Sequence, residues 1–114
     1  MFQMSLNRVH DTVRVHEGNE NIILKVNGDP MRMVAGLSQA QKMLKALNAE
    51  STEEERDAAA MYFAQVIFGK EQAEQLKEFY HQDAECVVLL CGRYFSGRLS
   101  KLITQAQKRN RVKK

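Results

Sequence analysis

The spacing of apolar residues in this chain changes once, at Asp29-Pro30, and this change constrains the fold more than any other feature. Before it, valines at odd positions alternate with polar residues, which is the period of a half-buried strand. These valines are Val9, Val13 and Val15. A second apolar run covers residues 22–26, after a turn-forming cluster at 17–21. We therefore predict a β-hairpin over residues 4–26. A lone hairpin is marginal in water, so it must pack on the rest of the chain or pair with strands of another subunit.

From Pro30 onward the apolar residues recur at helical spacing, and capping signals divide the sequence into segments. The first predicted helix runs from Pro30, or from a second capping box at Ser38 and Gln41, to Leu47. The second begins at the capping box of Thr52 and Glu55 and ends at a left-handed stop at Gly69. The third continues from there to a break at His81-Gln82, and the fourth runs from Asp83 to Lys108. The sequence thus predicts an α+β fold that is mainly α, with a hairpin followed by a bundle of about four helices. At this length, residues 1–114 are expected to form a single domain.

The last predicted helix changes character along its length. Its first turns, residues 87–91, are apolar nearly all round, which predicts a central and buried position. Ser96-Gly97 predicts a kink or a close helix crossing. The one-sided stripe of this helix consists of Val88, Phe95, Leu99, Leu102, Ile103 and Ala106. The apolar period ends at Lys108, so residues 109–114 are predicted to be a basic, frayed tail.

The charged residues are segregated along the chain. Residues 93–114 carry eight Lys/Arg and no Asp/Glu, whereas residues 1–92 carry nine Lys/Arg and fourteen Asp/Glu. The net charge of +3 therefore hides a strongly basic end and an acidic body. This asymmetry indicates an interaction tail, or pairing between opposite ends of neighbouring copies. The predicted contact residues at the basic end are Arg93, Tyr94, Arg98, Lys101, Lys108, Arg109 and Arg111.

Three interpretations of this basic end stay open. Cations in the last turns of a helix stabilise it by about 0.3–1 kcal/mol, so the end needs no partner to explain it. With Tyr94 as a stacking residue, the same cations would contact nucleic acid, although no nucleic-acid-binding signature is present. An apolar stripe with a cationic flank also suits the binding of an acidic amphipathic helix.

The sequence lacks the residue patterns of catalytic and metal sites. His10 and His16 share a face of the predicted strand but lie about 20 Å apart, which is too far for a common metal ion. Cys86 and Cys91 are separated by about 7.5 Å along one predicted helix, which is too far for a disulfide. No glycine-rich phosphate-binding loop occurs. We predict a protein that is not an enzyme and holds no metal or cofactor. Without a membrane span or a secretory signal in the sequence, the expected location is the cytoplasm.

Two stretches of the chain resemble a known family. Residues 68–80, FGKEQAEQLKEFY, and residues 91–109, CGRYFSGRLSKLITQAQKR, are similar to the C-terminal half of the small tail assembly chaperones of tailed phages and prophages of Gram-positive bacteria. The similar elements are Phe68-Gly69 before a Glu-rich short helix, the Cys-Gly-x-Tyr-Phe core at 91–95, the pair Arg98-Leu99 and the segment 103–108. The resemblance covers roughly a third of the chain.

The resemblance implies a non-enzymatic protein that coats the long, hydrophobic tape-measure protein and keeps it soluble while tail-tube subunits polymerise around it. It also implies an abundant, multimerising protein in the cytoplasm of a bacterial host. The expected partners are therefore the tape-measure protein or another tail protein, together with further copies of the chain, and no membrane. Two alternatives stay open: a small nucleic-acid-associated protein that uses the basic C-terminal helix, and a structural head–tail or tail component whose hairpin adds strands to a neighbour.

Overall fold

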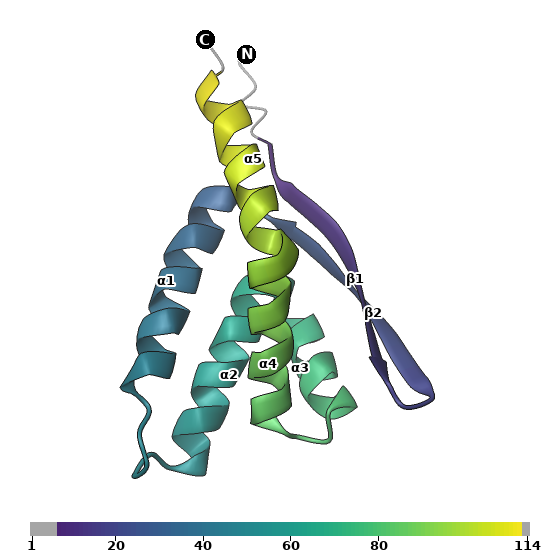
Figure 1. Cartoon of the computed structure of the whole chain (residues 1–114), viewed down its shortest axis with the longest axis vertical. Coiled ribbons are helices and arrows are strands. Elements are labelled where there is room, and N and C mark those ends of the chain that lie inside the picture. Colours follow the sequence, from purple (N-terminus) through teal and green to yellow (C-terminus); the bar gives the residue numbers. More distant parts are fainter. Residues whose placement is uncertain (1–6, 113–114) are drawn as a thin grey trace.

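The computed structural model describes residues 7–112, in which a β-hairpin lies against a group of helices (Figure 1). The predicted fold class, α+β and mainly α with an N-terminal hairpin, is confirmed. In chain order the elements are β1 (Val9–Glu17), β2 (Glu20–Gly28), α1 (Pro30–Ala46), α2 (Glu53–Phe68), α3 (Lys70–Phe79), α4 (Ala84–Tyr94), the π-helical segment η1 (Phe95–Leu99) and α5 (Ser100–Val112).

The hairpin packs on the helices of its own chain. β1 and β2 are antiparallel, with Val13 opposite Leu24. Because side chains alternate along a strand, one face, here called the inner face, turns toward the helices, and the opposite outer face turns to solvent. The buried residues of the inner face are Val9, Val15, Leu24 and Val26. The prediction of a hairpin is confirmed, although β2 extends to Gly28, and residues 4–6 of the predicted range lie outside the described residues.

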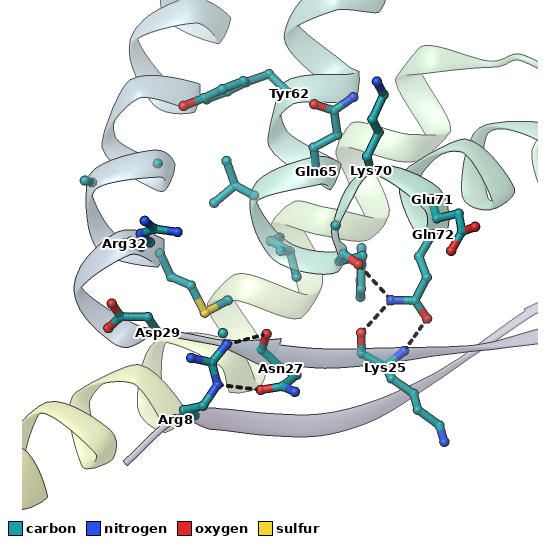
Figure 2. A pocket seen from close by; sticks show the side chains of 18 of the residues that line it. Arg8, Lys25, Asn27, Asp29, Arg32, Tyr62, Gln65, Lys70, Glu71 and Gln72 are labelled. Carbon is teal, nitrogen blue, oxygen red and sulfur yellow. Dashed lines mark hydrogen bonds between the residues drawn. The ribbon is translucent and has the colours of Figure 1, made fainter. Parts of the chain in front are cut away.

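A side-chain amide from a helix occupies each side of the hairpin, and we call these two contacts the amide clamps. At the free edge of β2, the backbone N–H of Lys25 donates to Oε1 of Gln72 at 2.8 Å, and Nε2 of Gln72 donates to the Lys25 carbonyl at 2.6 Å (Figure 2). Just before β1, the backbone N–H of Asn7 donates to Oδ1 of Asn110 at 2.7 Å, and Nδ2 of Asn110 donates to the Asn7 carbonyl at 3.4 Å. Helices α3 and α5 are thereby tied to the hairpin through its backbone.

The predicted start of α1 at Asp29-Pro30 is confirmed. Pro30 is the first helical residue, and Oδ1 of Asp29 accepts a hydrogen bond from the backbone N–H of Met31 at 3.1 Å. This cap satisfies one of the backbone donors that the first turn of a helix leaves free. The alternative start at Ser38 is wrong, because α1 runs through that residue without interruption.

The capping box before α2 is also confirmed. Oγ1 of Thr52 accepts from the backbone N–H of Glu55 at 3.1 Å, and the Glu55 carboxylate accepts from the backbone N–H of Thr52 at 2.7 Å. Gly69 ends the helix with φ 88° and ψ 164°. This is an extended conformation that only glycine adopts readily, so the left-handed helical stop predicted there is wrong in detail. The break after α3 is confirmed at His81 and Gln82, which both have positive φ.

The C-terminal helical segment follows the predicted stripe. Leu99, Ile103 and Ala106 are buried in the core. The irregularity predicted at Ser96-Gly97 is present as η1, a single π-helical segment between α4 and α5.

Two predictions for this segment are wrong. Helix α4 is not buried all round, because Leu89 is 55% exposed. The tail does not fray from residue 109, because α5 continues to Val112 and Asn110 holds the chain before β1. The remaining residues of the predicted tail, 113–114, lie outside the described residues.

Gly36 allows α1 to approach α2 closely. A Cβ atom added at Gly36 would lie 2.8 Å from Cγ1 and 2.9 Å from Cγ2 of Val66 on α2. Both distances are shorter than side-chain carbons tolerate, and the branched Val66 side chain has little freedom to move aside. The glycine that weakens α1 as an isolated helix is therefore required by its packing.

We predict that Gly36→Ala lowers the free energy of unfolding by about 1–2 kcal/mol, because overpacking outweighs the usual helix preference for alanine. The matched control is Gly92→Ala in α4, where nothing lies within 4 Å of the added Cβ. That variant should gain about 0.5–1 kcal/mol. Urea unfolding measures both values. In a Val66→Ala background the Gly36→Ala change should become stabilising; an unchanged penalty there would show that the contact with Val66 is not its cause.

Candidate polypeptide-binding site

The predicted contact residues of the basic end fall into two groups. Four of them are exposed on α4 and α5: Arg93, Lys101, Lys108 and Arg109. Arg111 belongs to α5, and its side chain lies outside the described part of the structure. Their role in binding another molecule stays a prediction. Tyr94 and Arg98 form the second group, because both make contacts within the chain.

Tyr94 and Arg98 both bind Asp11 on the inner face of β1. The Tyr94 hydroxyl donates to Oδ2 of Asp11 at 2.7 Å, and Nε of Arg98 donates to the same oxygen at 2.7 Å. The Asp11 side chain is only 9% exposed, whereas that of Arg98 is 62% exposed. The Tyr94 ring also stacks on Phe68, with ring centroids 6.0 Å apart. The ring predicted as a stacking platform for bases is thus packed inside the protein.

The contact of Asp11 with Tyr94 and Arg98, here called the junction, fixes the ionisation states of all three side chains. Burial acts to raise the pKa of Asp11, but hydrogen bonds from Arg98, Tyr94 and the backbone of Thr12 outweigh it, so the pKa lies below its ordinary value. Burial, followed by the hydrogen bond to the Asp11 carboxylate, raises the pKa of Tyr94. The hydrogen bond to Asp11 likewise raises the pKa of Arg98. At neutral pH the site therefore contains a carboxylate, a neutral phenol and a guanidinium.

An apolar groove lies between α1 and α5. The two helices run in opposite directions (Figure 1). Its volume is about 460 Å³, within the range of about 300–1,000 Å³ that is typical of binding sites. Phe63 of α2 also lines it. The other apolar lining residues are Val34, Leu37 and Leu44 from α1, Phe95 from η1 and Ile103 from α5. On α1, Val34 is 42% exposed and Met31 is 66% exposed, so apolar surface continues outside the groove.

Both wall helices are cationic. Neither α1 nor α5 contains an Asp or Glu residue, and no residue that lines the groove is acidic. Lys45 follows the lining residue Gln41 by four positions, and Lys108 follows the lining residue Thr104 by four. Residues four apart share a side of a helix, so these lysines continue the lining sides of their helices. The groove therefore combines an uncharged, largely apolar lining with a lysine close to it on each wall helix.

The contribution of α1 to this site was not predicted from the sequence. Its cations, Arg32, Lys42 and Lys45, fall within the part of the chain whose summed charge is negative. The available signal was the absence of any Asp or Glu from residues 30–46. Summing charge over residues 1–92 hid it, because all fourteen acidic residues of that part lie outside α1, in the hairpin, in the loops and in α2–α4.

The described chain shows little that suits covalent or metal chemistry. Within residues 7–112, no three His, Cys, Asp or Glu side chains gather closely enough to hold a metal ion. Cys86 and Cys91 are free thiols in α4, and burial raises the pKa of Cys91 to about 12, so this thiol is protonated at neutral pH. None of the described helices has the length and apolar character needed to cross a membrane.

Comparisons of the chain with known protein families, with curated proteins and with solved structures found no match. The resemblance to tail assembly chaperones therefore depends on the two stretches of sequence alone. In the structure these stretches contact each other, because the ring of Phe68, from the first, stacks on the ring of Tyr94, from the second.

We predict that the contribution of Asp11 to stability depends on pH. Its pKa in the folded state lies below the unfolded value of about 3.9, so its stabilisation is present above that value and is lost as pH falls through the folded pKa. Asp11→Asn should be less stable than the wild type at pH 7, and the difference should shrink between about pH 5 and pH 2. Urea unfolding across this range measures it.

The control for Asp11→Asn is Glu74→Gln, which alters an exposed carboxylate on α3. A difference from wild type that stays constant with pH would contradict the assignment. Tyr94→Phe should cost about 1 kcal/mol at pH 7, below the range of about 1.5–3 kcal/mol for a hydrogen bond to a charged group, because the contact is partly open to water.

Proposed function

We propose that this protein is a non-enzymatic assembly chaperone that binds an amphipathic, helical polypeptide in the groove between α1 and α5. The observation that carries the proposal is the combination of an apolar groove with two wall helices that lack Asp and Glu. A helix of the partner would place an apolar stripe in such a groove. Acidic residues that flank its stripe would face the lysines of the walls.

The sequence resemblance supports a specific version of this role. We propose that the partner is the tape-measure protein of a phage or prophage tail, and that binding takes place in the cytoplasm of the bacterial host. A tape-measure protein is long, hydrophobic and mostly helical, so it presents many apolar stripes to a small, abundant binding protein. The exposed Met31 and Val34 suit a partner of variable sequence, because methionine in particular adapts its shape to different neighbours.

We predict that Val34→Glu abolishes this activity without unfolding the protein, since Val34 lines the groove but is already 42% exposed. A partner bound in the groove would cover the new carboxylate and remove its water, which is unfavourable for a charged group. The measurement is the soluble yield of a tape-measure fragment co-expressed with each variant. Leu89→Glu is the matched control, because Leu89 is also an exposed aliphatic residue, at 55%, but lies on α4, outside the groove lining.

With wild type and Leu89→Glu the fragment should be soluble, and with Val34→Glu its soluble yield should fall to the level seen without the protein. Equal yields with both variants would place the binding site elsewhere. No gain in solubility with the wild-type chain would remove the chaperone role.

Copies of the chain are a second proposed partner. The first turn of α2 contains three consecutive glutamates, Glu53–Glu55, whereas every charged residue of α5 is a cation. Contacts between the acidic part of one copy and the basic end of another would be exposed to solvent and screened over about 8 Å at physiological ionic strength. We predict that the mass in sedimentation experiments falls as salt rises; a mass that does not change with salt would reject this pairing.

A further inference from the structure

The outer face of the hairpin carries positive charge and no carboxylate. Its permanent cations are Arg8, Arg14 and Lys25, and all three are exposed. The carboxylates of the hairpin lie elsewhere: Asp11 is on the inner face, and Glu17 and Glu20 are at the turn. The alternation of a strand has thus separated the two signs of charge onto opposite faces.

The other residues of the outer face are hydrogen-bonding groups rather than apolar ones. They include His10, His16, Asn21 and Asn27, which are all exposed. Ile23, at 49% exposure, is the single aliphatic residue among the outer-face positions of the two strands. Protein–protein interfaces have an apolar, aromatic-rich centre, whereas protein–DNA interfaces are polar and positively charged. The composition of this face therefore matches a nucleic acid better than a protein.

The contacts of the inner face hold the hairpin in place on the helices, so its outer face has a fixed position. Leu24, Val9 and Val26 are 0–2% exposed beneath it, and the amide clamps fix it to α3 and α5. Nine residues in each strand give a ribbon about 30 Å long, with its strands about 4.8 Å apart. The major groove of B-DNA is about 12 Å wide and admits a two-stranded ribbon.

Beside β2 lies an open cavity of about 1270 Å³ that extends the cationic surface (Figure 2). Arg8 and Lys25 line it from the hairpin, and Arg32 of α1 and Lys70 of α3 line it from the helices. Two carboxylates, Asp29 and Glu71, also contribute, so the cavity keeps an excess of positive charge. One sugar–phosphate backbone beside the ribbon would have both room and cations there.

We propose that the outer face of the hairpin binds duplex DNA by entering its major groove. Single-stranded nucleic acid is a poorer ligand, because the outer-face positions of the two strands carry no Phe, Tyr or Trp on which bases would stack. Duplex RNA is excluded by its deep, narrow major groove. Arg14 and Lys25 contact phosphates, and Asn21 reaches base edges. Arg8 contacts a phosphate through Nη1, because its Nε and Nη2 donate to the side chain and the carbonyl of Asn27 at 2.7 and 3.2 Å. This site is separate from the α1–α5 groove and does not depend on the proposed chaperone role.

The test is fluorescence anisotropy with a labelled 24-base-pair DNA duplex of mixed sequence and the full-length chain. Three phosphate contacts predict a slope of about −2.7 in log K against log salt, which is a loss of about 20-fold in affinity between 50 and 150 mM salt. We expect a dissociation constant in the range of about 10⁻⁶–10⁻⁴ M, as for sequence-independent binding. Absence of binding at 50 mM salt would overturn the proposal.

Charge-matched variants locate the site. The double variant Arg14→Gln, Lys25→Gln should weaken binding by at least about tenfold and reduce the slope to about −0.9. The control Lys42→Gln, Lys45→Gln removes the same charge from α1 and should change affinity less than twofold. A third pair, Lys101→Gln, Lys108→Gln, tests the basic C-terminal helix. If the loss of binding follows this third pair instead, the hairpin is not the DNA site.

The choice of competitor identifies the ligand. Unlabelled duplex DNA should displace the probe at lower concentration than single-stranded DNA, duplex RNA or polyglutamate of equal charge. Equal or better competition by polyglutamate would show a general affinity for polyanions and overturn the assignment to DNA. Val34→Glu should bind DNA as the wild type does, so failure of the chaperone proposal and failure of this one give different results.

Discussion

A two-stranded hairpin is barely stable in water, so the burial of its inner face against the helices is the constraint on which the rest of this structure depends. Leu24, Val9, Val15 and Val26 supply that face, and the residues beneath them come from distant parts of the chain. Because the buried face takes the apolar residues, the opposite face is left polar. The surface that we assign to DNA is thus a by-product of how the hairpin is stabilised.

The beginning and the end of the described chain lie side by side as a second result of this packing (Figure 1). Asn110 of α5 holds the backbone before β1, and Asp11 of β1 binds both Tyr94 and Arg98. One cation of the basic end, Arg98, is consequently paired with a carboxylate of the acidic body, Asp11, within the molecule. The cations of α5 and α1 take no part in this contact, and the negative total charge of residues 1–92 conceals those of α1.

Much of the fold was readable because its signals are local. The alternating valines, the Thr52–Glu55 capping box, the cap at Asp29 and the break at His81-Gln82 each involve residues within a few positions of one another. The candidate sites were not readable, because Asp11 meets residues 83 and 87 positions away and the groove needs two helices from opposite ends of the chain. The prediction that α4 is buried all round was wrong at Leu89, because the composition of a helix does not reveal which neighbours cover each of its sides.

The amide clamps also bear on how this protein behaves when many copies are crowded together. A free strand edge offers its N–H and C=O groups to any other strand, and this is a common route to aggregation and to domain swapping. At Lys25, Gln72 already occupies both groups, so an incoming strand would have to break two hydrogen bonds before forming its own. Sheet extension is thereby disfavoured at this point of the β2 edge, and a basic, partly apolar protein gains protection against fibril growth.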